Sequence, residues 1–190
     1  MHGDIATVQA DVLVNAANTQ LHMGGGVAAA LRSRGGIEIH QEAIRQAPAA
    51  LGTVVRTHAG RLSARFVYHA VVIDYDVSKG TSASDVATVM RNILAQAASD
   101  EVKSLALPLF GAGVGGLSIE TSLETILDEI EQGSRDLEGP LQVTIAVRDR
   151  EELERARECF RSYTDRESRK REESSLANDF LKELLKKRRD

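Results

Sequence analysis

Two glycine clusters constrain the fold most, because each stands between an apolar run of strand length and a helical pattern. The first, Gly24–Gly26, follows the run Val12–Val14, and the second, GAGVGG at 111–116, follows Ser104–Leu109. Glycine lets the backbone adopt a positive φ and come close to a neighbouring group. The two clusters therefore predict strand–loop–helix units whose glycine loops lie at strand ends.

Apolar runs and helical patterns alternate along the rest of the chain. The sequence predicts strands at 12–14, 53–58, 66–73, 104–109 and 142–147, and helices at 27–33, 37–46, 84–98, 119–131 and 151–163. Near-continuous apolar strands are typical of a sheet covered on both faces, which favours a three-layer α/β/α sandwich. The second and third strands are joined only by a short link containing Gly60, so we expect a hairpin and a central mixed β-sheet.

Composition narrows the class of protein. The chain has 190 residues, 42% hydrophobic and 27% charged, which is typical of one folded, soluble domain. The net charge of -4 counts against a broad nucleic-acid clamp. The single cysteine, Cys159, excludes an intrachain disulfide and a cysteine-based zinc site, and we expect no metal. With no apolar run near the roughly 18 residues of a membrane span and no signal segment, we expect a cytoplasmic protein without membrane contact.

The glycine clusters also indicate chemistry. Free N–H groups and the positive end of a helix favour an anion, usually phosphate, so two such loops could grip a diphosphate from opposite sides. For either loop alone, a tight turn that binds nothing is an equally good interpretation. The second loop fits the dinucleotide pattern G-x-G-x-x-G, but the acidic residue expected about 20 residues later would fall on a helix and its exit, 131–136. We therefore set a hydride-transferring dehydrogenase aside.

Several polar residues stand near the first loop. Asn18, at a strand end, suits a sugar hydroxyl because an amide both donates and accepts, although it could equally cap a turn. Asn15 is expected to bond to a neighbouring loop and stiffen it. Asp4 could accept from an amine such as that of adenine, or cap a turn. His22 is a weak candidate for assisting chemistry, and His69 is expected in the core with one hydrogen bond.

These residues together resemble the macrodomain family. The resemblance covers about residues 3–163 and rests on ordered motifs: Gly3-Asp4-Ile5, the segment 11–18 (DVLVNAAN), 24–27 (GGGV), Gly60, 67–71 (VYHAV), and 107–108 leading into 110–115 (FGAGVG). It implies a three-layer α/β/α fold with a cleft for ADP-ribose at the carboxyl ends of the central strands. It implies no cofactor.

The resemblance also implies roles for single residues. Asp4 would bind the adenine amine with Ile5 beside it, and Asn18 would hold the distal ribose. Asn18 and Gly26 are the positions at which catalysis is expected. The residues expected around the distal ribose and diphosphate are Gly25, Gly26, Val27, Phe110, Gly111, Ala112, Gly113, Val114 and Gly115. Arg148, at the end of the last strand, would stack on adenine in place of an aromatic side chain.

The chain departs from the family pattern in three places. Gly3-Asp4 stands almost at its start, whereas family members have one or two strands ahead of it, so we expect a missing N-terminal strand and an unpaired sheet edge. Ala28 stands where many hydrolytic members have aspartate, which leaves no obvious general base in the loop. Gly115 replaces a bulkier residue that closes over the phosphates, so we expect a looser grip.

Three functions remain open from the sequence. The first is an enzyme that removes a group from the distal ribose, either acetyl from O-acetyl-ADP-ribose or a protein side chain from mono-ADP-ribose, with water activated by the ligand's phosphate. The second is a module that reads ADP-ribose, or mono-ADP-ribosylated protein, without turnover. The third, which the acidic balance disfavours, is binding of poly(A) or another RNA.

The end of the chain differs in composition. We expect a macrodomain at 1–164 and a charged tail at 165–190, which contains nine Lys/Arg and seven Asp/Glu. Leu176, Phe180 and Leu184 are spaced as an apolar stripe on a helix. The tail is interpreted either as a terminal helix packed on its own domain or as a docking helix that mediates self-association. Cys159 is expected to be a small core residue.

Overall fold

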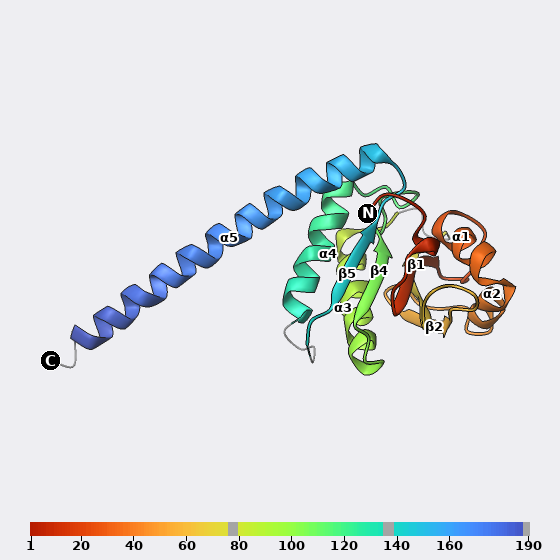
Figure 1. Ribbon diagram of the computed structural model, residues 1–190, viewed down its shortest axis with the longest axis horizontal. Helices are drawn as coiled ribbons and strands as arrows, with labels where there is room; N and C mark the ends of the chain where they lie inside the picture. Colours follow the sequence, from red (N-terminus) through yellow and green to blue (C-terminus); the bar gives the residue numbers. More distant parts are fainter. Residues whose placement is uncertain (76–79, 135–138, 188–190) are drawn as a thin grey trace.

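The computed structural model describes residues 1–75, 80–134 and 139–187, apart from the side chains of Ser174 and residues 176–187. Its elements are η1 (Ile5–Thr7), β1 (Val12–Asn18), α1 (Gly26–Gly35), α2 (Ile37–Ile44), β2 (Val54–His58), β3 (Phe66–Ile73), α3 (Ala83–Ser99), β4 (Ser104–Pro108), α4 (Ile119–Gly133), β5 (Gln142–Ala146) and α5 (Arg150–Lys187). Figure 1 shows their arrangement. Every strand and helix expected from the sequence is present; β3 has the expected ends, and the other elements differ at one end or both.

The sheet has the order β2-β3-β1-β4-β5. Strand β1 runs parallel to β3 on one side and to β4 on the other, and β5 is parallel to β4. Strand β2 alone is antiparallel, paired with β3. The predicted hairpin and mixed sheet are therefore confirmed, because the short link between β2 and β3 permits only an antiparallel return.

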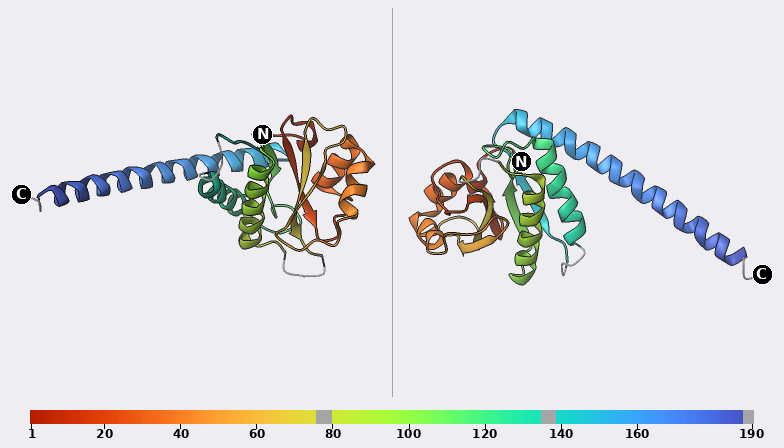
Figure 2. Two further views of the ribbon diagram at one scale, coloured as in Figure 1. Left: turned by 90° about the horizontal axis from the view of Figure 1, so that it is seen from below. Right: turned by 180° about the vertical axis from the view of Figure 1, so that it is seen from behind.

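The two faces of the sheet are covered by different helices, as the views in Figure 2 show. One face packs against α3 and α4 and contributes Val12, Val14, Tyr68 and Leu105 to that core. The other packs against η1 and α1 through residues that include Leu13. Successive residues of β1 thus point to opposite faces, and both faces are buried. The predicted three-layer sandwich is confirmed.

Residues 1–3 extend the sheet beyond β5. His2 forms a parallel bridge with Val147, and the Gly3 N–H donates to the Val147 carbonyl at 3.0 Å. The Met1 ammonium group donates to the Ile145 carbonyl. The edge expected to be unpaired is thus covered over 145–147, while residues 142–144 carry no outer strand in the part of the chain described. This short pairing also places Asp4 beside the carboxyl end of β5.

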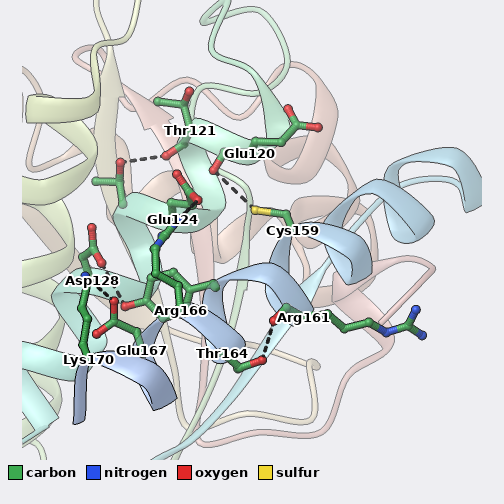
Figure 3. A network of polar contacts seen from close by, with 12 residues as sticks. Glu120, Thr121, Glu124, Asp128, Cys159, Arg161, Thr164, Arg166, Glu167 and Lys170 are labelled. Atoms are coloured by element: carbon green, nitrogen blue, oxygen red, sulfur yellow. Dashed lines mark hydrogen bonds and ion pairs between the residues drawn. The ribbon is translucent and has the colours of Figure 1, made fainter. Parts of the chain in front are cut away.

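Helix α5 is one continuous helix of 38 residues, about 57 Å long at 1.5 Å per residue. It crosses the expected boundary between residues 164 and 165 without a break. Its first part packs against α4 through ion pairs, and Figure 3 shows the residues of one of them, Arg166 and Glu124. In residues 150–173 of this helix only Cys159 and Tyr163 are buried. Arg166 Nη2 lies 3.1 Å from Glu124 Oε1.

Further along α5, Arg171 pairs with Glu131 of α4 at 2.6 Å. Beyond it α5 projects away from the body of the molecule (Figures 1 and 2). The apolar stripe at Leu176, Phe180 and Leu184 lies outside the described side chains. Among the described residues, no helix is long and apolar enough to cross a membrane.

A cluster of three polar side chains, Asn15, His69 and Thr57, is buried under α2, on the face of the sheet that carries α1 and α2. The Asn15 Nδ2 amide lies 3.1 Å from His69 Nδ1, and Thr57 Oγ1 lies 3.1 Å from His69 Nε2. An amide nitrogen can only donate, so Nδ1 accepts and Nε2–H donates to Thr57. Asn15 therefore bonds to a neighbouring strand rather than to a loop, and His69 makes two hydrogen bonds rather than one.

His69 makes the stability of the fold dependent on pH. Burial lowers its pKa to about 4 from an ordinary 6.5. Above pH 6.5 the ring is neutral in both the folded and the unfolded chain. Between pH 6.5 and 4 only the unfolded chain binds a proton, so the free energy of unfolding falls as pH falls, by up to about 3 kcal/mol. Urea unfolding across this range should show the loss.

The variant His69→Gln should lack this contribution, so the difference in unfolding free energy between wild type and variant should shrink as pH falls from 6.5 to 4. His58→Gln is the matched control, because His58 has a side chain that is 85% exposed. A wild-type curve that runs parallel to that of His69→Gln would contradict a buried neutral imidazole.

Candidate functional site

The carboxyl edge of the sheet contains a topological switch between β1 and β4. These strands are parallel neighbours, with Val12 opposite Leu105. The chain leaves β1 towards α1 on one face and leaves β4 towards α4 on the other, as Figure 1 shows. Loops that diverge in this way open a crevice beyond the strand ends, where α/β proteins bind ligands. The two glycine loops follow these two strands.

The first glycine loop has open space around its backbone. A Cβ added at Gly24, Gly25 or Gly26 would meet no atom within 4 Å. Gly26 has a φ of 55°, which glycine adopts without strain. Gly25 caps α1 without a side-chain hydrogen bond, and the first turn of α1 contains no acidic residue. The first N–H groups of this helix thus have no side-chain cap, and the open space beside the loop lets a negatively charged group approach this helix end.

Asn18 shapes the segment that leads into this loop. Its Oδ1 accepts the N–H groups of Gln20 and His22, both at 3.1 Å, and its Nδ2 donates to the His22 carbonyl at 3.0 Å. The side chain is therefore mainly engaged with its own loop, as in the turn-capping interpretation. An amide nitrogen carries two hydrogens, so one donor of Asn18 remains for a ligand.

The second glycine loop is held by close backbone packing. The Leu117 N–H donates to the Gly111 carbonyl at 2.9 Å, and the Thr81 N–H donates to the Gly115 carbonyl at 3.0 Å. Thr81 is only 6% exposed, and its hydroxyl donates to the Val72 carbonyl at 2.8 Å. Thr81 therefore ties this loop to the end of β3.

Gly115 fits where no side chain would. An added Cβ would lie 2.6 Å from Thr81 Oγ1 and 2.7 Å from Gly111 Cα. The space that a bulkier residue would need is thus already filled by Thr81 and the backbone. The second loop is therefore tightly packed at Gly115, and the looser grip on the phosphates expected from this glycine stays a prediction.

The middle of the second loop is exposed. An added Cβ at Gly113 would meet nothing within 4 Å, and Val114 is 80% exposed. Phe110, by contrast, is completely buried in the core against α3 and α4. Phe110 therefore supports the loop from within and has no surface free to flank a ribose, contrary to the expectation for it.

The residues expected near adenine lie together at the carboxyl end of β5. The hydrogen bond between Gly3 and Val147 joins the two segments just before Asp4 and just before Arg148, so these distant parts of the chain meet there. Ile5 is buried, so its side chain packs beneath this region. Arg148 has a side chain that is 80% exposed and pairs with Glu152 at 3.0 Å, so its guanidinium is accessible from solvent.

His22, two residues before the first glycine loop, lies close to His40 of α2. The rings of His22 and His40 are 6.3 Å apart, and burial, assisted by Arg32, lowers the pKa of His40. His40 is therefore neutral near pH 7.

Burial raises the pKa of Cys159, which makes this thiol a poor nucleophile. In the described part of the chain no three His, Cys, Asp or Glu side chains are grouped as a metal site would need.

Sequence reasoning missed two residues at this edge, Thr81 and Arg34. Thr81 lies between an expected strand and helix and belongs to no motif, so only the fold shows that it packs against Gly111. Arg34 is 30 residues from Asp4 but donates to it at 2.8 Å. The one available signal was its place near the end of a helix that starts at the glycine loop.

Comparison with known proteins identifies related chains. Residues 14–126 match the Macro domain family. An uncharacterized protein of Aquifex aeolicus is 38% identical over 130 residues, which cover 68% of this chain and 78% of that protein. An uncharacterized protein of Mycobacterium tuberculosis is 36% identical over 145 residues, which cover 76% of this chain but only 39% of that protein. This chain thus corresponds to part of the longer mycobacterial protein.

Solved structures share the fold. The Oceanobacillus iheyensis macrodomain, in a mutant form, superimposes with a TM-score of 0.77 at 24% identity, over 86% of this chain and 90% of that one. The Trypanosoma brucei macrodomain in complex with ADP-ribose gives a TM-score of 0.76 at 25% identity, over 84% of this chain and 67% of that one.

The packing at Gly115 predicts a difference between two glycines of one loop. Gly115→Ala should lower the free energy of unfolding by about 1–3 kcal/mol, because its Cβ has no room beside Gly111. Gly113→Ala should change stability by less than about 0.5 kcal/mol, because its Cβ enters open space. Urea unfolding of both variants measures the difference, and equal effects would contradict the packing described.

Proposed function

Because the chain belongs to the Macro domain family, we propose that it binds ADP-ribose or its derivatives and hydrolyses an ester on the distal ribose. The observation that carries the proposal is the pairing of two glycine loops on adjacent parallel strands, one of them with open space at an uncapped helix end. The Trypanosoma brucei macrodomain, which was solved with ADP-ribose, supports the choice of ligand.

In the proposed complex the diphosphate lies between the two loops. Gly25, Gly26 and Val27 offer the N–H groups at the start of α1, and residues 111–115 offer the backbone of the second loop. Asn18 uses its remaining amide hydrogen on the distal ribose. Adenine lies at the other end, with Asp4 at its amine and Arg148 against its ring.

The proposed reaction cleaves the bond between an acyl group and a ribose oxygen. O-acetyl-ADP-ribose and ADP-ribose on a carboxylate side chain are both such esters, so one chemistry serves both substrates. Water attacks the carbonyl carbon, the carbon–oxygen bond to ribose breaks, and the water proton passes to the leaving ribose oxygen. Ala28 and the acid-free first turn of α1 supply no general base, so the ligand's own phosphate takes the proton first. Asn18 and Gly26 orient the ribose and the phosphate.

The same features favour the alternative of a non-catalytic reader. Asn18 is mainly engaged with its own loop, and Ala28 is buried with no carboxylate to offer. Binding of poly(A) or RNA has less support, since the net charge is -4 and the cationic runs lie in the last part of the chain.

Calorimetric titration with ADP-ribose tests binding, and acetate release from O-acetyl-ADP-ribose tests turnover. The wild-type chain should bind ADP-ribose with a micromolar dissociation constant. Gly113→Glu should abolish binding, because its carboxylate enters the open space of the loop and repels the diphosphate. Gln41→Glu adds the same charge on α2 and should bind as wild type does.

The outcomes separate the functions. Binding with acetate release supports the enzyme, and binding without release supports the reader. If Gly113→Glu binds ADP-ribose as tightly as wild type does, the diphosphate does not bind at this loop. A wild-type chain that binds neither compound would overturn the proposal.

We also propose that the last part of α5, within the tail 165–190, mediates self-association. The support is its projection beyond Arg171 and the spacing of Leu176, Phe180 and Leu184 in the sequence. A projecting helix with an apolar stripe is stabilised when a second copy covers that stripe.

Light scattering measures the expected dimer. Replacing Phe180 and Leu184 together by glutamate should yield a monomer, because the stripe loses its apolar character. Replacing Asn178 and Lys182 by glutamate, at the same spacing but off the stripe, should preserve the dimer. A monomeric wild-type chain would support the interpretation of the tail as an element of its own domain.

A further inference from the structure

The carboxylate of Asp4 is held by a donor on each oxygen. The Ala6 N–H donates to Oδ1 at 2.9 Å, and Arg34 Nε donates to Oδ2 at 2.8 Å. The Asp4 side chain is 37% exposed and that of Arg34 is 55% exposed, so both groups reach solvent. Arg34 lies in the last turn of α1, the helix that begins at the first glycine loop.

We infer that Arg34 is a positioning residue that sets the preference of this site for a base bearing an exocyclic amine, by holding the Asp4 carboxylate towards that amine. The inference rests on the proposed function, since it takes the ligand to be ADP-ribose and Asp4 to face adenine. It adds a residue from α1 to the recognition of the base.

The first reason is geometric. A carboxylate has about four lone-pair positions, and Ala6 and Arg34 occupy one on each oxygen. The remaining positions are fixed in direction, because neither oxygen can rotate away without losing a hydrogen bond. A fixed acceptor distinguishes bases well. It accepts from the amine of adenine, whereas the carbonyl oxygen of hypoxanthine at the same position repels it.

The second reason is electrostatic. The ligand carries a negatively charged diphosphate, and a bare carboxylate in the same site would oppose its approach. The guanidinium of Arg34 offsets the charge of Asp4 while leaving its outward lone pairs available. Loss of this exposed charge should weaken binding of ADP-ribose and of its hypoxanthine analogue slightly and equally, because they share the diphosphate, whereas loss of the fixed acceptor should weaken binding of ADP-ribose alone.

The contact itself contributes little to folding. An ion pair with both partners partly exposed stabilises a protein by at most about 1 kcal/mol, so variants of Arg34 should remain folded. The Arg155–Glu120 pair between α5 and α4 is a matched control, at 2.9 Å with side chains 46% and 44% exposed.

The experiment compares ADP-ribose with its analogue that carries hypoxanthine in place of adenine, by calorimetric titration of the full chain. Arg34→Ala should weaken ADP-ribose binding about fivefold, and binding of the analogue by less than about twofold, so the preference for adenine falls. Arg34→Lys should restore part of the affinity, because it returns the charge without the planar fork of donors. Arg155→Ala should bind both ligands as wild type does.

A double-mutant cycle tests whether Arg34 acts through Asp4. In the Asp4→Ala background, Arg34→Ala should have no further effect on the preference for adenine. Equal weakening of both ligands by Arg34→Ala, or no weakening, would overturn the inference while leaving ADP-ribose binding intact. A wild-type chain that binds neither ligand would overturn the proposed function and the inference with it.

Discussion

Strand β1 has no face that meets water and no free edge, and the rest of the domain is arranged around that constraint. Its side chains enter both cores, and parallel neighbours pair with it on both sides. A buried backbone requires such pairing for its polar groups. Because the strand is packed on both faces and paired on both sides, it sets where the segments at the carboxyl edge begin. The glycine loops owe their mutual position to this strand.

Much of the fold could be predicted because burial leaves a strong pattern in a sequence. Long apolar runs predicted the strands, and the short Gly60 link predicted the single antiparallel pair. Contacts between distant residues left no such pattern. Thr81 fills the space beside Gly115 only because β3 and β4 flank β1, and Arg34 meets Asp4 only once η1 packs on α1. The unbroken course of α5 was also missed, since composition changes near residue 165 although the helix does not end.

The carboxyl edge of the sheet offers backbone groups at its centre and side-chain groups at its β5 end. At its centre, exposed N–H groups and open space suit a group with several charged oxygens, whatever is attached to it. At its β5 end, Asp4 and Arg148 present directional and planar groups instead. The buried Asn15–His69–Thr57 group holds the adjoining strands β1, β3 and β2 together beneath α2. Its hydrogen bonds require a neutral imidazole, so the order of this half of the sheet depends on pH.

The attachment of α5 limits where anything bound to its far end can be. From Arg171 to Lys187 the helix continues for 16 residues, about 24 Å. A straight rod of that length works as a spacer. Whatever holds its tip stays remote from the glycine loops, and a second domain held there cannot fold back onto them without bending the helix. The helix would thus let two domains belong to one assembly while the glycine loops of each remained accessible to ligands.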